Sequence, residues 1–297
     1  MSFEQSTPVA SSRQNGWPWQ PDNRPKHSAH EEIAWPKITV VTPSYNQGKF
    51  LEATLRSVIL QDYPNLEFLV LDGGSSDNSV DIIKKYGASI TYWHSRKDLG
   101  QADALATGFT MATGEILCWL NSDDIFLAGA LMHVALVFLK HPKTRFVYGN
   151  RMVIDEHDKV IDCHIWPFFI TKYHWARGQY LAQECCFWKR DLYLQIGGID
   201  RSKFFIMDYD LFFRMWGVAK FRKTSAYLGC LRMHGETKNS KYQQVREKEF
   251  STALQKYGLK VPGYFRVRIM NRFDALQVKI DKTIQRLKGW RRNACAL

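Results

Sequence analysis

The sequence contains no apolar run long enough to cross a bilayer. Its longest apolar segment, 128–139, includes His133 and falls short of the about 20 residues that a spanning helix needs. The first five residues show no basic region followed by an apolar stretch, so we expect no signal peptide. These absences favour a cytoplasmic protein, whose contact with a membrane would be peripheral.

Cysteine is sparse, with six residues in a chain of 297. The cysteines show no paired spacing typical of a metal site, and a chain of this size does not need a disulfide framework. We therefore expect mostly buried, reduced thiols. The cysteines are Cys118, Cys163, Cys185, Cys186, Cys230 and Cys295.

The sequence also lacks the glycine-rich turn of dinucleotide-binding proteins. A nicotinamide-dependent oxidoreductase would carry Gly-x-Gly-x-x-Gly after its first strand. The corresponding segment, 43–48, has a single glycine at its end. This class is therefore a weaker alternative for the chain.

Acidic residues are fewer than basic ones, 29 against 41, which gives a formal net charge of +12. Such an excess attracts nucleic acid, anionic lipid or a phosphorylated substrate. Segment 264–292 alone has nine basic residues and two acids, a charge of +7. Because the charge is concentrated there, a non-catalytic binding protein for lipid or nucleic acid is the weaker interpretation, and we do not expect nucleic acid as a partner.

Short apolar runs alternate with amphipathic segments between residues 38 and 148. This rhythm predicts an α/β fold with crossover helices on a parallel sheet, whose ligands lie beyond the carboxyl ends of the strands. The composition is that of a folded domain, with 45% hydrophobic residues. We expect strands near 38–41, 66–71, 89–93, 116–120 and 146–148, and helices near 50–59, 80–83, 102–113 and 128–140.

Segment 264–292 predicts an amphipathic helix, because apolar residues recur at spacings of three and four. Two interpretations stay open. The apolar stripe could lie on an anionic membrane surface, or it could pack on the rest of the protein or on another subunit. The stripe consists of Ile269, Phe273, Leu276, Ile280, Ile284 and Leu287.

Two adjacent acids, Asp123 and Asp124, follow the apolar run 116–120. Adjacent carboxylates repel each other, so their position at a strand end indicates a cation between them. Oxygen ligands suit Mg²⁺ or Mn²⁺, which in turn bind diphosphates. The alternative is an Asx-turn or the N-cap of the next helix.

Three further positions have a chemical and a structural interpretation each. Asp72 begins a Gly-Gly-Ser-Ser turn and could accept hydrogen bonds from a nucleoside, or simply belong to a turn that caps the next helix. Asp208 could be a general base or a helix N-cap. His234 could bind a metal ion or be a structural histidine.

Eight ordered segments together resemble family 2 glycosyltransferases, the inverting group with the GT-A fold. The resemblance covers about residues 37–240. The segments are 40–47 (VVTPSYNQ), 61–64 (QDYP), 71–77 (LDGGSSD), 100–104 (GQADA), 112–115 (ATGE), 119–124 (WLNSDD), 197–200 (GGID) and 207–211 (MDYDL).

This resemblance implies a Rossmann-like nucleotide-sugar-binding mixed sheet and the site residues. The donor would contact Thr42, Pro43, Tyr45, Asn46, Asp72, Gln101, Asn121, Ser122 and Asp123. Mn²⁺ or Mg²⁺ would be held by Asp123 and Asp124, with His234 near the metal, and Asp208 would be the base. The chain departs from the family pattern at Gly73 and Asn121, where members often have acids.

The resemblance also implies a domain division and an activity. We expect a flexible arm at 1–35, a catalytic domain at 36–240 and a basic helical extension at 241–297. Within the catalytic domain, the nucleotide-sugar half would cover about 36–150 and the acceptor half about 151–240. The implied activity is metal-assisted transfer of a hexose-type sugar, with inversion, from a nucleotide-diphosphate sugar to a sugar or lipid-linked glycan acceptor during polysaccharide or glycoconjugate assembly.

Overall fold

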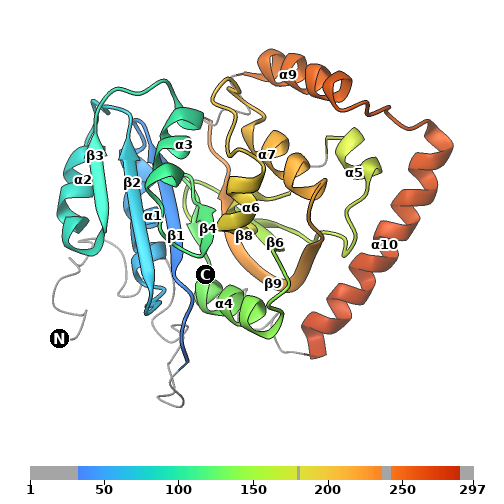
Figure 1. Cartoon of the computed structure of the whole chain (residues 1–297), viewed down its shortest axis with the longest axis horizontal. Helices are drawn as coiled ribbons and strands as arrows, with labels where there is room; N and C mark the ends of the chain where they lie inside the picture. The colour runs from blue at the N-terminus through green and yellow to red at the C-terminus, as the bar shows by residue number, and fades with distance from the viewer. Residues whose placement is uncertain (1–32, 179–180, 236–241, 288–297) are drawn as a thin grey trace.

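One mixed β-sheet runs through the described part of the chain, and helices cover both of its faces (Figure 1). The computed structural model describes residues 33–178, 181–235 and 242–287. The strand order is β3-β2-β1-β4-β8-β6-β9-β5, and β7 pairs with β6. The strands are β1 (Ile38–Ser44), β2 (Leu66–Asp72), β3 (Tyr92–Ser95), β4 (Ile116–Trp119), β5 (Ile125–Phe126), β6 (Phe146–Ile154), β7 (Val160–His164), β8 (Cys186–Lys189) and β9 (Phe221–Arg232).

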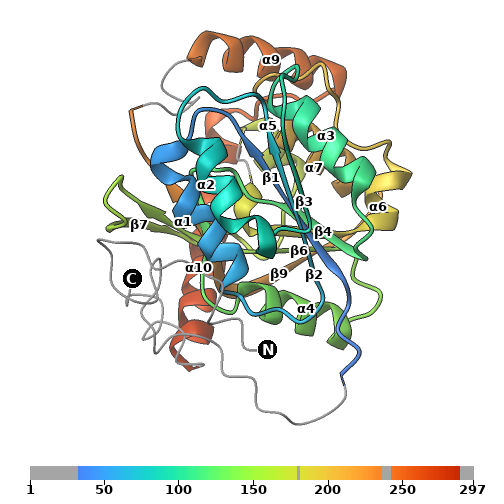
Figure 2. The ribbon, with the colours of Figure 1, turned by 90° about the vertical axis from the view of Figure 1, so that its left-hand side faces the viewer.

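The helices fall into two groups. Helices α1, α2 and α4 contribute to the hydrophobic cluster on one face of the sheet, and α3, α6 and α7 to the cluster on the other. Figure 2 shows α1 and α2 on one side of the strands and α3 on the other. The helices are α1 (Gly48–Ile59), α2 (Ser79–Tyr86), α3 (Gln101–Met111), α4 (Ala130–Lys140), α5 (Lys172–Ala176), α6 (Arg190–Gln195), α7 (Met207–Trp216), α9 (Gln243–Lys256) and α10 (Tyr264–Leu287), with short 3₁₀ turns η3 (Gly87–Ser89) and η4 (Gln183–Cys185).

The first strands are buried on both faces, as expected of parallel strands between helices. In β1, Val40 packs into one hydrophobic cluster and Val41 into the other, because successive side chains point to opposite faces. The parallel register places Ser44 beside Asp72, and Val41 beside Trp119 of β4. The carboxyl ends of three strands therefore meet at one edge, as predicted.

Two stretches differ from the expectation. The strand predicted at 89–93 begins later, at Tyr92, because Gly87–Ser89 forms the 3₁₀ turn η3. The sequence predicts no strand after residue 148, yet the part of the chain after residue 150 contributes β7, β8 and β9 to the same sheet. Strand β8 runs antiparallel to both β4 and β6, which makes the sheet mixed, as the family resemblance implies.

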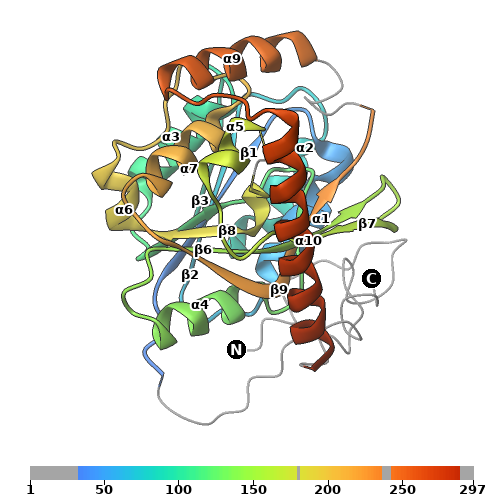
Figure 3. The same cartoon turned by 90° about the vertical axis from the view of Figure 1, so that its right-hand side faces the viewer.

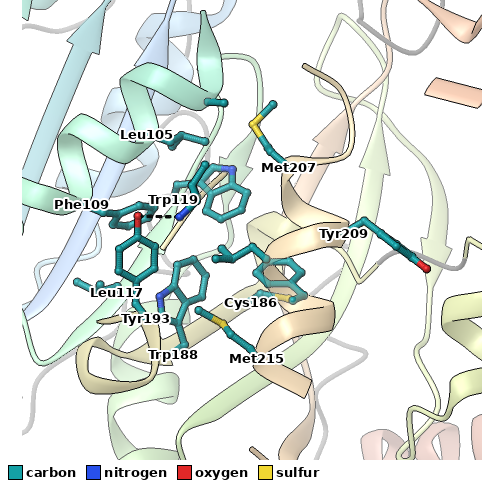
Figure 4. Packing of buried hydrophobic residues seen from close by; sticks show 14 of the residues in the cluster. Leu105, Phe109, Leu117, Trp119, Cys186, Trp188, Tyr193, Met207, Tyr209 and Met215 are labelled. Atoms are coloured by element: carbon teal, nitrogen blue, oxygen red, sulfur yellow. Dashed lines mark hydrogen bonds between the residues drawn. The ribbon is translucent and has the colours of Figure 1, made fainter. Parts of the chain in front are cut away.

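A group of aromatic side chains fills the cluster between the sheet and helices α3, α6 and α7 (Figure 4). Trp119 of β4 stacks on Phe212 of α7, with ring centroids 5.7 Å apart, and meets Trp188 of β8 edge to face at 5.5 Å. Such aromatic pairs stabilise a core beyond the effect of burial alone. They join α7 firmly to the strands that carry the predicted site.

Most of the described cysteines are buried, as predicted. Cys118, Cys185, Cys186 and Cys230 are buried, Cys163 is exposed, and none of the five is in a disulfide. Cys295 lies outside the described residues. None of the described helices combines the length and the apolar character that a membrane span requires.

Helix α10 runs along the outside of the domain (Figure 3). It contacts the domain through polar residues. The carboxylate of Asp281 forms an ion pair with the ammonium group of Lys223 on β9, and both side chains have no exposed surface. Asn150 Nδ2 of β6 donates to Asp281 Oδ2 at 3.0 Å. Burial lowers the pKa of Lys223, while the Asp281 charge raises it. This buried pair fixes α10 to the sheet.

We predict that Asp281→Ala destabilises the protein by about 3–5 kcal/mol, because it leaves the buried Lys223 charge uncompensated. Chemical unfolding measures the loss. Asp281→Leu combined with Lys223→Met should recover most of it, since no buried charge then remains. Asp81→Ala on exposed α2 is the control and should change stability by less than about 0.5 kcal/mol. Equal losses in Asp281→Ala and the double variant would contradict the role of the pair.

Candidate active site

Two loops at the carboxyl ends of β1 and β2 are tied together by side-chain hydrogen bonds. Asn46 has a left-handed backbone, with φ of 51°. Its N–H donates to Ser75 Oγ at 2.8 Å, and its Oδ1 accepts from the N–H of Ser76 at 2.9 Å. Asp77 Oδ2 accepts from the N–H of Gly48 at 2.8 Å. The loops thus form one unit.

The carboxylate of Asp72 is fully buried at the base of this unit. Its Oδ2 accepts from the N–H groups of Ser75 and Gly74 at 2.8 and 3.1 Å and from Ser95 Oγ at 2.6 Å. Ser75 Oγ donates to the other oxygen, at 2.5 Å. Asp72 therefore shapes the loop, and its contact with a nucleoside stays a prediction.

Two hydroxyl groups of β1 are available at the same edge. Thr42 Oγ1 and Ser44 Oγ are buried and have no hydrogen-bond partner among the described residues. Buried polar atoms without a partner are uncommon and indicate a missing water or ligand. Pro43 lies between them, and the Tyr45 ring that follows is 62% exposed. This edge thus offers two orphaned hydroxyls, those of the predicted donor residue Thr42 and of Ser44, and an accessible aromatic side chain just after β1.

The end of β4 is linked to the start of α3. Gln101 Nε2 donates to Asn121 Oδ1 at 2.8 Å, and Asn121 Nδ2 donates to Asp124 Oδ2 at 3.2 Å. Ser122 is buried beside them. The structure therefore brings these predicted donor residues to the edge where β1 and β2 end.

Asp123 faces His234, which follows β9 in the chain. His234 Nε2 lies 3.1 Å from Asp123 Oδ2, with the two side chains 3% and 22% exposed. The imidazole also packs on the ring of Phe50, with centroids 4.5 Å apart. The sequence separation of these residues is large, and the fold makes them neighbours.

Asp124 points away from Asp123 and into the protein. Its Oδ1 accepts from the N–H of Arg232 at 3.0 Å, and its Oδ2 accepts from Gln183 Nε2 at 3.1 Å. Burial raises the pKa of Asp124, and the negative charges of Asp123 and Glu184 raise it further. The predicted metal-binding role of Asp124 is untested, but its contacts are those of a supporting residue.

Sequence reasoning missed Arg232 as part of the site. Its guanidinium group is buried: Nε donates to the carbonyl oxygen of Asp123 at 2.8 Å, and Nη1 lies 2.6 Å from Asp158 Oδ1. Gln183 and Glu184 were missed as well. A signal existed, because this polar pair and Arg232 interrupt otherwise apolar stretches.

A divalent cation fits the Asp123–His234 pair. A carboxylate oxygen and an imidazole nitrogen are suitable ligands for Mn²⁺. Neighbouring ligands of an octahedral ion at about 2.1 Å lie about 3 Å apart, which matches the observed separation. No group of three or more metal-binding side chains occurs in the described part of the chain. The remaining ligands would come from a bound diphosphate and water.

Asp208 lies in the first turn of α7, half-buried. The N-cap of this helix is Ile206, so the N-cap alternative for Asp208 does not hold. Its Oδ1 accepts from the N–H of Tyr209 at 2.7 Å. The adjacent Met207 packs in the same cluster as Trp119 of β4 (Figure 4), which brings the start of α7 to the strand that leads into Asp123.

The entry into α7 is held by a residue of α9 that the sequence did not reveal. The Glu249 carboxylate accepts from the N–H groups of Phe204, Phe205 and Ile206 at 2.9, 2.9 and 3.0 Å. These groups precede a helix with no side-chain cap of its own. Glu249 therefore supplies the missing acceptor from a distant segment.

Comparison with known proteins places these features in a family. The model of "Glycosyl transferase family 2" matches residues 39–191, about half of the chain. A relative from Rickettsia typhi, described as an uncharacterised glycosyltransferase, is 26% identical over 72% of this chain and 70% of its own length. A similar protein from Rickettsia felis is 27% identical, and the match spans 37% of that longer protein.

One relative has a named activity, and several solved structures are similar in fold. The Escherichia coli UDP-Glc:α-D-GlcNAc-diphosphoundecaprenol β-1,3-glucosyltransferase is 33% identical over 45% of this chain and 53% of its own. Staphylococcus aureus TarS in complex with UDP-GlcNAc has a TM-score of 0.57 at 16% identity, covering 69% of this chain and 61% of that one. A Pyrobaculum calidifontis mannosyltransferase with GDP-Man and Mn²⁺ has a TM-score of 0.52 at 16% identity, covering 88% and 86%. These structures share the fold, as predicted.

We predict that Glu249→Ala frees the backbone that leads into α7. Amide hydrogen exchange at residues 204–206 should become faster, because the three N–H groups lose their common acceptor. Glu247→Ala, two residues away on the same helix, is the control and should leave these amides protected. Unchanged exchange in Glu249→Ala would show that this carboxylate does not hold the segment.

Proposed function

Because the chain belongs to glycosyl transferase family 2, we propose that it transfers a sugar from a nucleotide-diphosphate sugar to an acceptor hydroxyl with inversion of the anomeric carbon. The observation that carries this proposal is the Asp123–His234 pair at the carboxyl edge of the sheet. It lies where the β4 end and the linked loops after β1 and β2 converge.

The donor occupies this edge in the proposed complex. The orphaned hydroxyls of Thr42 and Ser44 become hydrogen-bonded, and the exposed Tyr45 ring covers an apolar face of the nucleoside. Gln101 and Asn121 line the neighbouring strand end. UDP and GDP donors occur in the solved structures with this fold.

Asp123 and His234 hold the divalent cation, with Asp124 and Arg232 fixing their positions. When bound, the cation neutralises charge on the diphosphate leaving group. The protein's own contribution is placement: the Asp123 carbonyl is fixed by Arg232, and His234 is fixed by Phe50. Both ligands are thus preorganised for the diphosphate.

Asp208 acts as the general base in this proposal. The acceptor oxygen attacks the anomeric carbon from the face opposite the diphosphate. The new C–O bond forms as the anomeric C–O bond to the diphosphate breaks, and the acceptor proton passes to the Asp208 carboxylate. One such displacement inverts the configuration. General-base assistance of this kind contributes about 10²–10⁴ in rate.

The proposed acceptor is a sugar or lipid-linked glycan in polysaccharide or glycoconjugate assembly. The support is the Escherichia coli relative, whose named acceptor is a diphosphoundecaprenol-linked sugar. The two other function classes are not favoured. The chain has no dinucleotide-binding turn, and its predicted site residues gather at one edge of the sheet rather than in the basic segment.

We predict that release of nucleotide from the correct donor requires Mn²⁺ or Mg²⁺ and stops in EDTA. A panel of nucleotide-diphosphate sugars, tested with and without metal, identifies that donor. In calorimetry, Asp123→Ala and His234→Ala should weaken Mn²⁺-dependent binding of the matching nucleoside diphosphate about tenfold or more. Asp162→Ala is the control, because Asp162 forms a similar but exposed pair with His164. Full turnover in EDTA would remove the metal from the proposal.

We predict that Asp208→Asn keeps the fold and donor affinity but lowers kcat by about 10² or more, since the amide cannot take the acceptor proton. Asp191→Asn on the exposed side of α6 is the control and should behave as wild type. Near-normal turnover of Asp208→Asn would refute the base role. The NMR coupling constant of the wild-type product tests inversion separately, and a retained configuration would exclude the single displacement.

A further inference from the structure

Helix α10 carries three rows of different chemistry along its length. Its polar row faces the domain, whereas its apolar row and its basic row face outward. The residues recur at spacings of three, four or seven, which places the members of each row on one side of a helix. The polar row is Asp274, Gln277, Asp281 and Gln285, the apolar row is Ile269, Phe273, Leu276 and Ile280, and the basic row is Arg268, Arg272, Lys279 and Lys282.

The polar row fixes the rotation of the helix. Besides the Lys223–Asp281 pair, His174 Nε2 lies 3.2 Å from Asp274 Oδ1, and Gln277 Oε1 accepts from the N–H of Phe169 at 3.1 Å. These contacts come from β9, α5 and the loop before α5. A helix held at three points along one side cannot turn its apolar row inward without breaking all of them.

The apolar row is consequently uncovered. Leu276 is 55% exposed and Phe273 44%, and Tyr264 and Phe265 at the start of the helix are exposed still more. The interpretation in which the stripe packs on the rest of this chain is therefore wrong for Phe273 and Leu276, which leaves a membrane surface or another subunit as the covering surface. An exposed apolar surface of this length marks an interaction site.

The basic row lies next to the apolar row and has no counter-charge. Arg268, Arg272, Lys279 and Lys282 are exposed and form no ion pair with the described residues. The only acids of α10, Asp274 and Asp281, are turned toward the domain. The outward surface of the helix thus combines apolar side chains with positive charge alone.

A cavity of about 350 Å³ lies where α10 begins, beside this surface. Lys172, Lys260 and Arg266 contribute to its lining, together with Ile269 of the apolar row and Tyr173. Three cations around a partly apolar cavity are suited to a phosphate group that is attached to an acyl chain.

We propose that α10 is the surface by which this protein docks on an anionic lipid bilayer. The apolar row enters the headgroup region, the basic row contacts anionic headgroups, and the cavity at its start accepts one headgroup phosphate. This arrangement is that of a helix lying in the membrane interface. Pairing with α10 of a second copy is disfavoured, because it would bring two basic rows together with no acid between them.

The proposal places the catalytic domain beside the membrane. Helix α10 runs from the end of the molecule at which β1 and β2 finish to the opposite end (Figures 1 and 3). Figure 1 shows α10 on the opposite side of the domain from β1 and β2, so docking along this helix holds the domain at the bilayer with these strands on its far side. The docking itself does not depend on sugar transfer and can be tested without a donor.

Sedimentation with vesicles tests the proposal on the full chain. Vesicles of phosphatidylcholine with phosphatidylglycerol should bind the protein, and added salt should weaken the binding. Vesicles of phosphatidylcholine alone should bind it much less. Leu276→Ser/Ile280→Ser should reduce binding about tenfold or more, and Arg268→Gln/Arg272→Gln by a similar factor. These side chains are exposed, so both variants should keep the wild-type melting temperature.

Two matched controls separate a local effect from a general one. Leu136→Ser/Leu139→Ser removes two exposed leucines from α4, and Lys84→Gln/Lys140→Gln removes the same charge from α2 and α4. Both should bind vesicles as wild type does. Equal losses in the controls, or wild-type binding by both α10 variants, would overturn the proposal. The proposal would also be overturned if the wild-type protein did not bind vesicles but formed a dimer, and if Leu276→Ser/Ile280→Ser dissociated that dimer.

Discussion

The contact between Asp124 and Arg232 is the constraint on which the candidate site depends. Asp124 lies in the loop after β4, and Arg232 is the last residue of β9. The hydrogen bond between them therefore joins segments more than one hundred residues apart. The same arginine holds the carbonyl of Asp123. Because His234 is two residues beyond Arg232, this contact determines that the imidazole meets the Asp123 carboxylate. This contact requires the Asp124 carboxylate to be buried, and burial raises its pKa.

Much of the fold, and the position of the candidate site at the strand ends, could be predicted from local sequence. Runs such as 38–41 and 66–71 are apolar, short and followed by turn residues. The strand ends and the loops beyond them could therefore be located from the sequence. Parallel strands then bring Asp72 and Asp123 to one edge. The sequence did not show how the surroundings of these carboxylates differ: Asp72 and Asp124 are enclosed by protein donors, whereas the Asp123 side chain is 22% exposed.

The long-range partners of several polar residues could not be predicted from the sequence. Glu249 holds the backbone before α7 from another helix, and Gln183 reaches Asp124 from the short turn before β8. The sequence around Glu249 resembles that of any surface glutamate, and the sequence around Gln183 resembles that of any buried polar residue. Neither stretch indicates which distant residue the side chain contacts. The strands after residue 150 were missed for a related reason: β8 is only four residues long and is defined by its neighbours β4 and β6.

Helix α10 shows why an amphipathic pattern predicts a helix better than it predicts which side is covered. Burying the apolar row against the domain would have been favourable by area alone. Yet Lys223 lies in the surface that receives the helix, and a buried ammonium group needs a carboxylate more than an apolar neighbour. Asp281 meets that need, and its position on the helix then dictates that Leu276 and Ile280 face outward. One charge on β9 thus decides the surface that the protein presents to its surroundings.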